Sequence, residues 1–224
     1  MTKRTLTAAL AALLIVSLAA PASAGFWNKG DQIEGSGKME SRTFDFDEIT
    51  AYQLDGSLDT EIAFGDRQKV EVTLDDNLFD NLEIEVDHGT LIIGWDESCD
   101  PDRKAKVVLT LSKLDEIDLN GAGDIVIDGF SGKSFDLELR GAGDVTIDGK
   151  CDELEITLMG VGDIEARKLD AKHVDVTVTG VGDAEVTAVE SIEARVSGVG
   201  DIKYWGNPES ENTKVSGIGD IKRK

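Results

Sequence analysis

The chain has 224 residues, of which 45 are acidic and 23 basic, and its formal net charge is −22. Such a negative surface repels the phosphate backbone of nucleic acids and disfavours adsorption to anionic lipid, so we expect neither as a partner. Regular apolar periodicity accompanies the charge, which indicates a folded chain and not a disordered acidic segment.

Residues 1–24 have the pattern of a secretory signal peptide. Lys3 and Arg4 form a positive n-region, residues 6–20 are apolar, and Ala-Ser-Ala at 22–24 is a small-residue cleavage site. The alternative, a transmembrane anchor, would need a run of about 20 apolar residues. We therefore expect cleavage before Gly25, no transmembrane segment in the mature chain, and an exported, periplasmic or extracellular protein. Loss of the two basic residues changes the net charge from −22 to −24.

After the signal peptide, residues 25–40 are polar and are interpreted as a leader or first cap, and residues 41–224 as a single domain. The irregular first half of this domain, 41–113, contains short runs in which apolar and charged residues alternate. This pattern is typical of strands with one face in a core and one in water. Asp75 to Asp80 is also compatible with one helical turn. The alternating runs lie at 52–55, 60–64, 69–74, 82–86, 90–93 and 107–111.

The regular half, 114–224, is organised by six copies of Gly-Xaa-Gly-Asp. Successive copies begin 20, 19, 20, 18 and 19 residues apart, and each lies between two runs of alternating apolar residues. Two glycines around one residue supply positive φ angles or close backbone approach, which a tight corner requires. The glycines predicted to form these structural corners are Gly121, Gly123, Gly141, Gly143, Gly160, Gly162, Gly180, Gly182, Gly198, Gly200, Gly217 and Gly219.

This repeat predicts the fold class. A fixed period of about 19 residues with short strands is typical of an all-β solenoid, a parallel β-helix in which the chain climbs one rung per repeat. A leucine-rich repeat has a similar length, but its Leu-x-x-Leu-x-Leu-x-x-Asn frame is absent. A β-sandwich is the other competitor, and it does not require a regular repeat.

The aspartates of the repeat admit two interpretations. They could accept backbone N–H bonds within their own corners, as in Asx-turns. Alternatively, stacked about 4.8 Å apart, they could hold cations such as calcium between them. The first arrangement is the commoner one, and we expect no cofactor. The weak candidates for metal binding are Asp124, Asp144, Asp163, Asp183, Asp201 and Asp220.

The Xaa positions are Ala, Val or Ile and form a second ladder. If these side chains face outward, they make an apolar stripe suited to a partner. If they tuck into the corners, they belong to the core, which is the commoner arrangement.

Other chemistry is sparse in this sequence. No dinucleotide or P-loop motif occurs, His88 and His173 belong to no metal-spaced cluster, and we assign no catalytic residue. Cys99 and Cys151 could form a disulfide in an oxidising compartment. In a regular solenoid they would lie about three rungs or 14 Å apart, beyond disulfide reach unless the loop around Cys99 closes the gap.

The chain resembles a family of exported bacterial proteins, the putative auto-transporter adhesins of the head GIN domain type. The resemblance covers roughly residue 33 to the C-terminus and includes Gly35-Ser36-Gly37, Phe46-Asp47-Glu48-Ile49, Asp75-Asp76-Asn77-Leu78 and Gly89-Thr90-Leu91-Ile92-Ile93, besides the repeated Gly-Xaa-Gly-Asp. In the family Xaa is often Ser, whereas here it is Ala, Val or Ile. The resemblance implies a right-handed parallel β-helix and an exported location, and it brings no catalytic residues.

We therefore expect a non-enzymatic β-solenoid that acts as a binding or adhesion module for a polysaccharide or protein at the cell envelope. Its strand face would present acidic and hydroxyl side chains, among them Asp136, Glu138, Glu155, Thr157, Asp175, Thr177 and Thr179. Two alternatives remain. One is a polysaccharide lyase or hydrolase with an arginine or lysine beside two carboxylates and a cation. The other is a structural component of an envelope assembly, stacked through its terminal rung.

Overall fold

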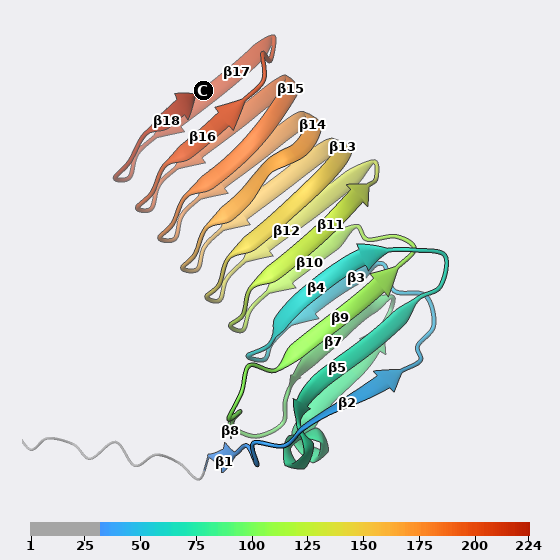
Figure 1. The fold of residues 1–224 in the computed structure, drawn as a ribbon. Helices are drawn as coiled ribbons and strands as arrows, with labels where there is room; N and C mark the ends of the chain where they lie inside the picture. The colour runs from blue at the N-terminus through green and yellow to red at the C-terminus, as the bar shows by residue number, and fades with distance from the viewer. Residues whose placement is uncertain (1–31) are drawn as a thin grey trace, which may run out of the picture. The chain divides into compact units, whose positions relative to one another are not determined.

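The structure, a computed structural model, describes residues 32–224, so the predicted signal peptide and residues 25–31 of the predicted leader lie outside the described residues. The described chain is nearly all β and winds into a β-solenoid, which confirms the predicted fold class (Figure 1). Its elements are β1 (Ile33–Glu34), β2 (Met39–Phe44), β3 (Ala51–Leu54), β4 (Asp59–Phe64), β5 (Lys69–Asp75), the 3-10 helix η1 (Asp76–Asn81), β6 (Leu82–Asp87), β7 (Thr90–Trp95), β8 (Cys99–Asp100), β9 (Lys106–Leu111), β10 (Glu116–Leu119), β11 (Ile125–Ser131), β12 (Ser134–Leu139), β13 (Val145–Leu158), β14 (Ile164–Val178), β15 (Ala184–Val196), β16 (Ile202–Trp205), β17 (Ser210–Val215) and β18 (Ile221–Arg223).

Two sheets form the walls of the solenoid. Sheet I contains, in spatial order, β6, β7, β3, β10, β12, the second halves of β13, β14 and β15, and β17. Sheet II contains β2, β5, β9, β4, β11, the first halves of β13, β14 and β15, then β16 and β18. Each of the long strands β13, β14 and β15 therefore bends from sheet II into sheet I.

Alternation of side chains produces the core between the two sheets. The parallel register aligns the inward side chains of neighbouring strands in ladders. In sheet I one ladder contains Ile117, Leu137, Ile156, Val176 and Ala194, each at most 1% exposed. Full burial of a side chain such as Ile or Leu contributes about 1.5–3 kcal/mol. A single rung cannot bury its own apolar face, so this stabilisation depends on stacking between neighbouring rungs.

The repeated glycines form the corners that connect sheet I to sheet II. A Cβ atom at Gly160 would lie 2.0 Å from the carbonyl oxygen of Gly141 on the preceding rung. At Gly162 it would lie 2.0 Å from the carbonyl oxygen of Gly143, and the φ angle of Gly162 is +147°. The first glycine of each corner thus permits close contact between rungs, and the second also permits a backbone conformation that L-residues rarely adopt.

The order of the rungs differs from the expected climb of one rung per repeat. The turn made by β3 and β4 lies between the turn made by β7 and β9 and the turn made by β10 and β11. The chain therefore builds its first turn, adds the second on one side of it, and crosses to the other side for the third. From β10 onward each repeat adds one rung, as the spacing predicted.

The N-terminal end of the solenoid is closed by elements inserted between β4 and β7. Strands β5 and β6 pair antiparallel with β9 and β7, and β2 pairs antiparallel with β5. Of the two possibilities left open for Asp75 to Asp80, the structure has the helical turn, η1, whose Leu78 and Phe79 are buried. Asp75 is fully buried and its two carboxylate oxygens accept N–H bonds from Gly37 (2.6 Å) and Asp102 (3.1 Å), so it ties the segment before β2 to the loop after β8.

The C-terminal end is built differently. Strands β17 and β18 pair only with β15 and β16, so within residues 32–224 their outer backbone edges have no strand partner. Glu211 takes an inward position in β17, opposite Ile192, and the Arg223 guanidinium on β18 lies 3.1 Å from its carboxylate. The Tyr204 hydroxyl also donates to Glu211 (3.0 Å). A polar bridge between the two sheets thus ends the apolar core.

Candidate functional site

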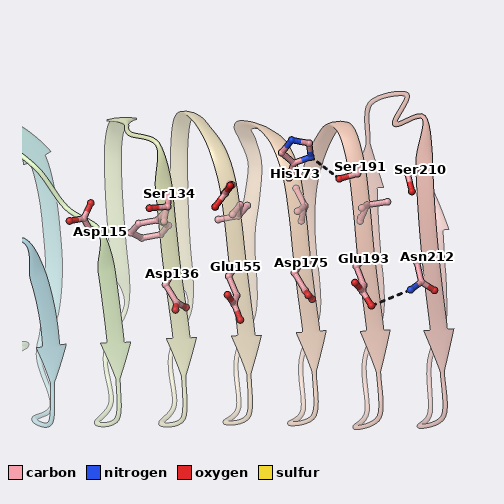
Figure 2. A pocket seen from close by; sticks show the side chains of 15 residues that line it. Asp115, Ser134, Asp136, Glu155, His173, Asp175, Ser191, Glu193, Ser210 and Asn212 are labelled. Carbon is pink, nitrogen blue, oxygen red and sulfur yellow. Dashed lines mark hydrogen bonds between the residues drawn. The ribbon is translucent and has the colours of Figure 1, made fainter.

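The outward side chains of sheet I form polar columns along the solenoid. The strand register aligns Glu116, Asp136, Glu155, Asp175, Glu193 and Asn212 in one column. It aligns Ser134, Glu153, His173, Ser191 and Ser210 in the next. Together with Asp115, most of these side chains line an open concavity of about 610 Å³ that crosses five strands (Figure 2). The bend of each long strand into sheet I lies directly before this concavity.

Hydrogen bonds and ion pairs occupy the C-terminal part of this concavity. His173 Nδ1 lies 2.8 Å from the Ser191 hydroxyl, and the Asn212 amide donates to Glu193 at 3.1 Å, as Figure 2 shows. The Arg195 guanidinium, from the adjacent outward column, contacts Glu193 and lies 3.3 Å from Asp175. At this end the carboxylates therefore have donors close by.

The N-terminal part of the concavity carries uncompensated negative charge. Asp136, Glu153 and Glu155 are exposed and form no ion pair within residues 32–224. Partial burial raises the pKa of the Asp136 carboxyl, and the charges of Glu138 and Asp118 raise it further. The pKa of Glu116 is raised for the same reasons, burial first and acidic neighbours second. A ligand that offers hydroxyl, amino or ammonium donors would stabilise these carboxylates, whereas an anionic ligand would be repelled.

The aspartates of the Gly-Xaa-Gly-Asp corners form a ladder of hydrogen bonds between rungs. Asp163 Oδ1 accepts the backbone N–H of Asp183 at 2.8 Å, and the Asp144 carboxylate accepts that of Asp163 at the same distance. Each aspartate oxygen therefore accepts a hydrogen bond from the following rung. In an Asx-turn it would accept one from its own corner. The same bond joins all six candidate aspartates: Asp124, Asp144, Asp163, Asp183, Asp201 and Asp220.

One member of this ladder is hidden in the sequence. Asp59 Oδ1 accepts the backbone N–H of Asp124 at 3.2 Å, and Ser57 bridges to Ala122 as the Xaa residues bridge to one another. Gly56-Ser57-Leu58-Asp59 is therefore a degenerate corner in which Leu replaces the second glycine. The signal that could have found it is the Gly-x-x-Asp spacing directly before an alternating run.

Lysine side chains lie beside part of the aspartate ladder. Lys104 lies 3.0 Å from Asp59, and Lys203 lies 3.6 Å from Asp183, so lysines neutralise part of its charge. Within residues 32–224 no three His, Cys, Asp or Glu side chains are grouped so that they could hold a metal ion. The backbone N–H groups of the ladder and these lysines therefore offset part of the negative charge, and cation binding at the six aspartates remains a proposal for experiment.

The Xaa side chains form an exposed stripe and not part of the core. Val161, Val181, Val199 and Ile218 are 58%, 51%, 45% and 72% exposed. Their backbones join through single parallel bridges from rung to rung, so the side chains point away from the solenoid at its narrow edge. The commoner, buried arrangement is therefore not adopted at these four positions.

The sequence left open whether Cys99 and Cys151 form a disulfide, and in the structure they lie apart and unpaired. Cys99 in β8 and Cys151 in β13 are both free. Cys99 belongs to the pair β1–β8 beside the N-terminal end, whereas Cys151 lies at the bend of β13, where burial raises the pKa of its thiol to about 11. His88 is exposed in the turn between β6 and β7, far along the chain from the concavity that contains His173.

The sequence profile of the putative auto-transporter adhesins, head GIN domain, matches residues 45–208. The chain belongs to this family. The matched segment contains the first turns of the solenoid with their non-sequential order, the degenerate corner and most of the regular repeats. The family description supports a binding module and implies an exported protein, and it does not specify a partner.

Solved structures share this fold. A putative adhesin from Bacteroides fragilis is 26% identical, with a TM-score of 0.71, and the match covers 86% of this chain and 100% of the other. A protein from Parabacteroides distasonis described as a putative lipid binding protein is 24% identical over 85% of this chain and 99% of its own, with a TM-score of 0.51, and shows the fold alone. No curated protein sequence matches the chain. Within residues 32–224 no helix has the length and apolar character needed to cross a membrane.

Proposed function

We propose that this head GIN protein is a non-enzymatic binding module at the bacterial cell envelope, periplasmic or extracellular, and that the concavity of sheet I holds its ligand. One observation carries the proposal: polar side chains from five adjacent strands are aligned in register around a single open concavity of about 610 Å³. Rungs repeat about every 4.8 Å, so such a surface suits an extended polymer, a polysaccharide or a protein segment, better than a small molecule.

The chemistry of the concavity selects among such polymers. Its side chains are carboxylates, hydroxyls, one imidazole and one amide, and the four apolar side chains beneath them, Phe135, Leu154, Val174 and Ile192, are at most 3% exposed. Carboxylates accept hydrogen bonds from hydroxyl and amino groups, and charge-assisted bonds are the stronger ones. We therefore expect neutral or amino-sugar polysaccharides, or basic protein segments, and not uronic-acid polymers.

A binding screen with matched variants tests this proposal. The probes are neutral, amino-sugar and uronic-acid polysaccharides, basic peptides and whole bacterial cells, each with and without millimolar calcium. Asp136→Asn with Glu155→Gln changes the concavity, and Asp128→Asn with Glu165→Gln makes the same two chemical changes at exposed carboxylates of sheet II that form no ion pair within residues 32–224. We expect the concavity variant to weaken binding at least tenfold and the control less than twofold. Equal effects of the two variants, or no binding by any probe, would overturn the proposal.

The enzymatic alternative has one observation in its favour. Arg195 contacts Asp175 and Glu193, and Arg140 contacts Asp118 and Glu138, so an arginine meets two carboxylates at two places on sheet I. Prolonged incubation of the protein with each bound polysaccharide, followed by measurement of new reducing ends and unsaturated products, separates binding from cleavage. We expect none to form, and products that disappear with Arg195→Ala would establish the alternative.

A further inference from the structure

The two ends of the solenoid carry strand edges without partners in the described chain. Sheet I ends at β6 on the N-terminal side and at β17 on the C-terminal side, and sheet II ends at β2 and β18. Each end strand pairs with one neighbour only, so half of its backbone donors and acceptors point along the solenoid axis. Such edges are templates for pairing with another chain, and proteins usually blunt them.

The charges at the two ends have opposite signs. Residues 76–88, which form η1 and β6, contain five carboxylates and no lysine or arginine. Lys38 and strand β2 add two basic residues and one acidic residue, so these segments together have a net charge of 2 − 6 = −4. Residues 210–224, which form β17 and β18, contain four basic and two acidic residues, although the whole chain has a net charge of −22. Both acidic residues of this last segment are in ion pairs, Glu211 with Arg223 and Asp220 with Lys222. The C-terminal end is therefore a basic cap on an acidic protein.

A single outward column of sheet I shows this polarity at the residue level. The register places Glu85, Ile92, Gln53, Asp118 and Glu138 at successive positions from the N-terminal end. The same column continues through Thr157 and Thr177 and ends at Arg195 and Lys214. It thus begins with an exposed carboxylate on β6 and ends with two basic side chains. In a second copy placed along the same axis, Lys214 of one copy would face Glu85 of the next.

We propose that the protein associates with a second copy of itself end to end, with the basic C-terminal rung of one copy against the acidic N-terminal end of the next. Contacts between like ends are disfavoured, because they would bring two segments of net charge +2, or two of net charge −4, against each other. The lysines at the C-terminal edge discourage pairing with arbitrary strands. They also favour contact with an acidic end over contact with another basic end.

The strand topology fits this polarity. Beyond the turn of β7 and β9, sheet II continues through β5 and β2, whereas sheet I continues only through β6. Strand β2 is thus the outermost strand, and β18 of a neighbouring copy would lie beside it. On sheet I, β17 and β6 would then be separated by one empty strand position, about 9.6 Å between the two strands. The side chains of Lys214 and Glu85 are long enough to meet across that gap.

A contact between unlike ends is heterologous, so it leaves a free end at each side and builds chains without a fixed number of copies. The polar columns of sheet I would then continue from one copy to the next. This inference rests on the two ends and not on the concavity, so its failure would leave the proposed binding function untouched.

Sedimentation velocity of the protein purified after export tests the inference. In about 10 mM salt the average mass should rise with protein concentration beyond two copies, and in about 300 mM salt the association constant should fall at least tenfold, because the Debye length shortens. A monomer at every concentration in low salt would overturn the proposal. Assembly that stops at two copies would equally overturn it, because it would indicate contact between like ends.

Charge reversal at each end gives the decisive comparison. One variant carries Glu83→Lys and Glu85→Lys, and the other Lys214→Glu and Lys224→Glu; none of these four side chains forms an ion pair within residues 32–224. Each variant alone should remain monomeric, a mixture of the two should associate, and the protein with all four changes should associate again. Retained assembly in either single variant would contradict the proposal.

A control variant excludes a general effect of charge. Glu165→Lys with Asp170→Lys changes two exposed carboxylates of β14 in the middle of the solenoid and alters the net charge as the N-terminal variant does. Its association should remain within twofold of the unchanged protein. A loss of association as large as that of the N-terminal variant would show that net charge, and not end-to-end contact, governs assembly.

Discussion

Substitution of a corner glycine tests how strongly stability depends on the close approach of the rungs. At Gly160 the obstacle is steric alone, because its φ angle is not positive, and an added Cβ would lie 2.0 Å from the carbonyl oxygen of Gly141. Ordinary van der Waals contact begins near 3.4 Å. The Gly160→Ala corner must therefore move away from the preceding rung by more than 1 Å, roughly the difference between those two distances.

The cost follows from the hydrogen bonds that this movement breaks. The N–H of Gly160 donates to Leu139 at 2.8 Å, and the N–H of Val161 donates to Gly141 at 3.0 Å. Each such bond contributes about 0.5–1.5 kcal/mol net, and a buried group left without a partner costs about 1–3 kcal/mol. With two bonds lost or lengthened, we expect Gly160→Ala to lower the free energy of unfolding by about 3–5 kcal/mol.

Urea denaturation followed by circular dichroism measures this free energy, and two other glycines separate the causes. Gly129 has φ +75° but no atom within 4 Å of an added Cβ, so Gly129→Ala isolates the backbone conformation at about 1–2 kcal/mol. Gly162→Ala combines a φ of +147° with a contact of 2.0 Å and should cost the most. The reasoning is refuted if Gly160→Ala costs no more than Gly129→Ala.

Three further predictions concern titratable groups. Asp163→Ala should lower the free energy of unfolding by about 1 kcal/mol, because the N–H of Asp183 loses its acceptor. Asp163→Asn keeps an acceptor oxygen and should cost less. Equal urea midpoints for the two variants would contradict the hydrogen-bond ladder. Asp136→Asn should raise the melting temperature at pH 7 but not at pH 3. The pKa of Asp136 is higher in the folded protein than in the unfolded chain, where it is about 3.9, so its carboxyl group lowers the stability of the fold as the pH rises above that value. A higher melting temperature of the variant at pH 3 would contradict this reasoning. With a thiol reagent at pH 8, Cys99 should react faster than Cys151. Burial raises the pKa of both thiols, that of Cys151 to about 11, but the Cys99 side chain is only half-buried and the reagent can reach it. Similar rates would show that β13 opens readily.

The regular half of the fold could be predicted from the sequence because two periodic signals agree. The side chains alternate with period two, and the corners recur about every 19 residues. Together these signals assign the inward ladder, including Leu137 and Ile156, to the core. Local steric rules also assign glycine to the corners, since no other residue allows rungs to approach so closely.

The rung order could not be predicted, because parallel pairing leaves no local signal of which strands are neighbours. Ala51 to Leu54 in β3 pairs with Glu116 to Leu119 in β10, 65 residues later in the chain. The segment between these strands could have stacked on either side of β3, because the alternation of inward and outward side chains is the same in both cases. The degenerate corner at Asp59 does not match the Gly-Xaa-Gly-Asp pattern, because Leu58 stands in place of the second glycine.

The candidate site was predicted in part. Alternation placed Asp136, Glu155 and Asp175 on an outward face, and the structure adds that they share one column. The neighbouring column with Ser134 and His173 was not expected, because its position depends on where each long strand bends into sheet I. The register between strands is irregular just before that bend, at Thr146 to Asp148 for example, and a local pattern of apolar residues does not encode such a shift.

The non-sequential turn order has a consequence for biogenesis and for length variation. The turn of β3 and β4 has two unpaired edges until β7, β9, β10 and β11 are available to pair with them. About 80 residues, from 51 to 131, must therefore be synthesised and exported before this first part of the fold can form. Each later repeat needs only the rung before it. Duplication or deletion of whole repeats after residue 131 should therefore be tolerated during evolution. Loss or gain of a single turn before residue 131 should not be tolerated, because these turns depend on one another.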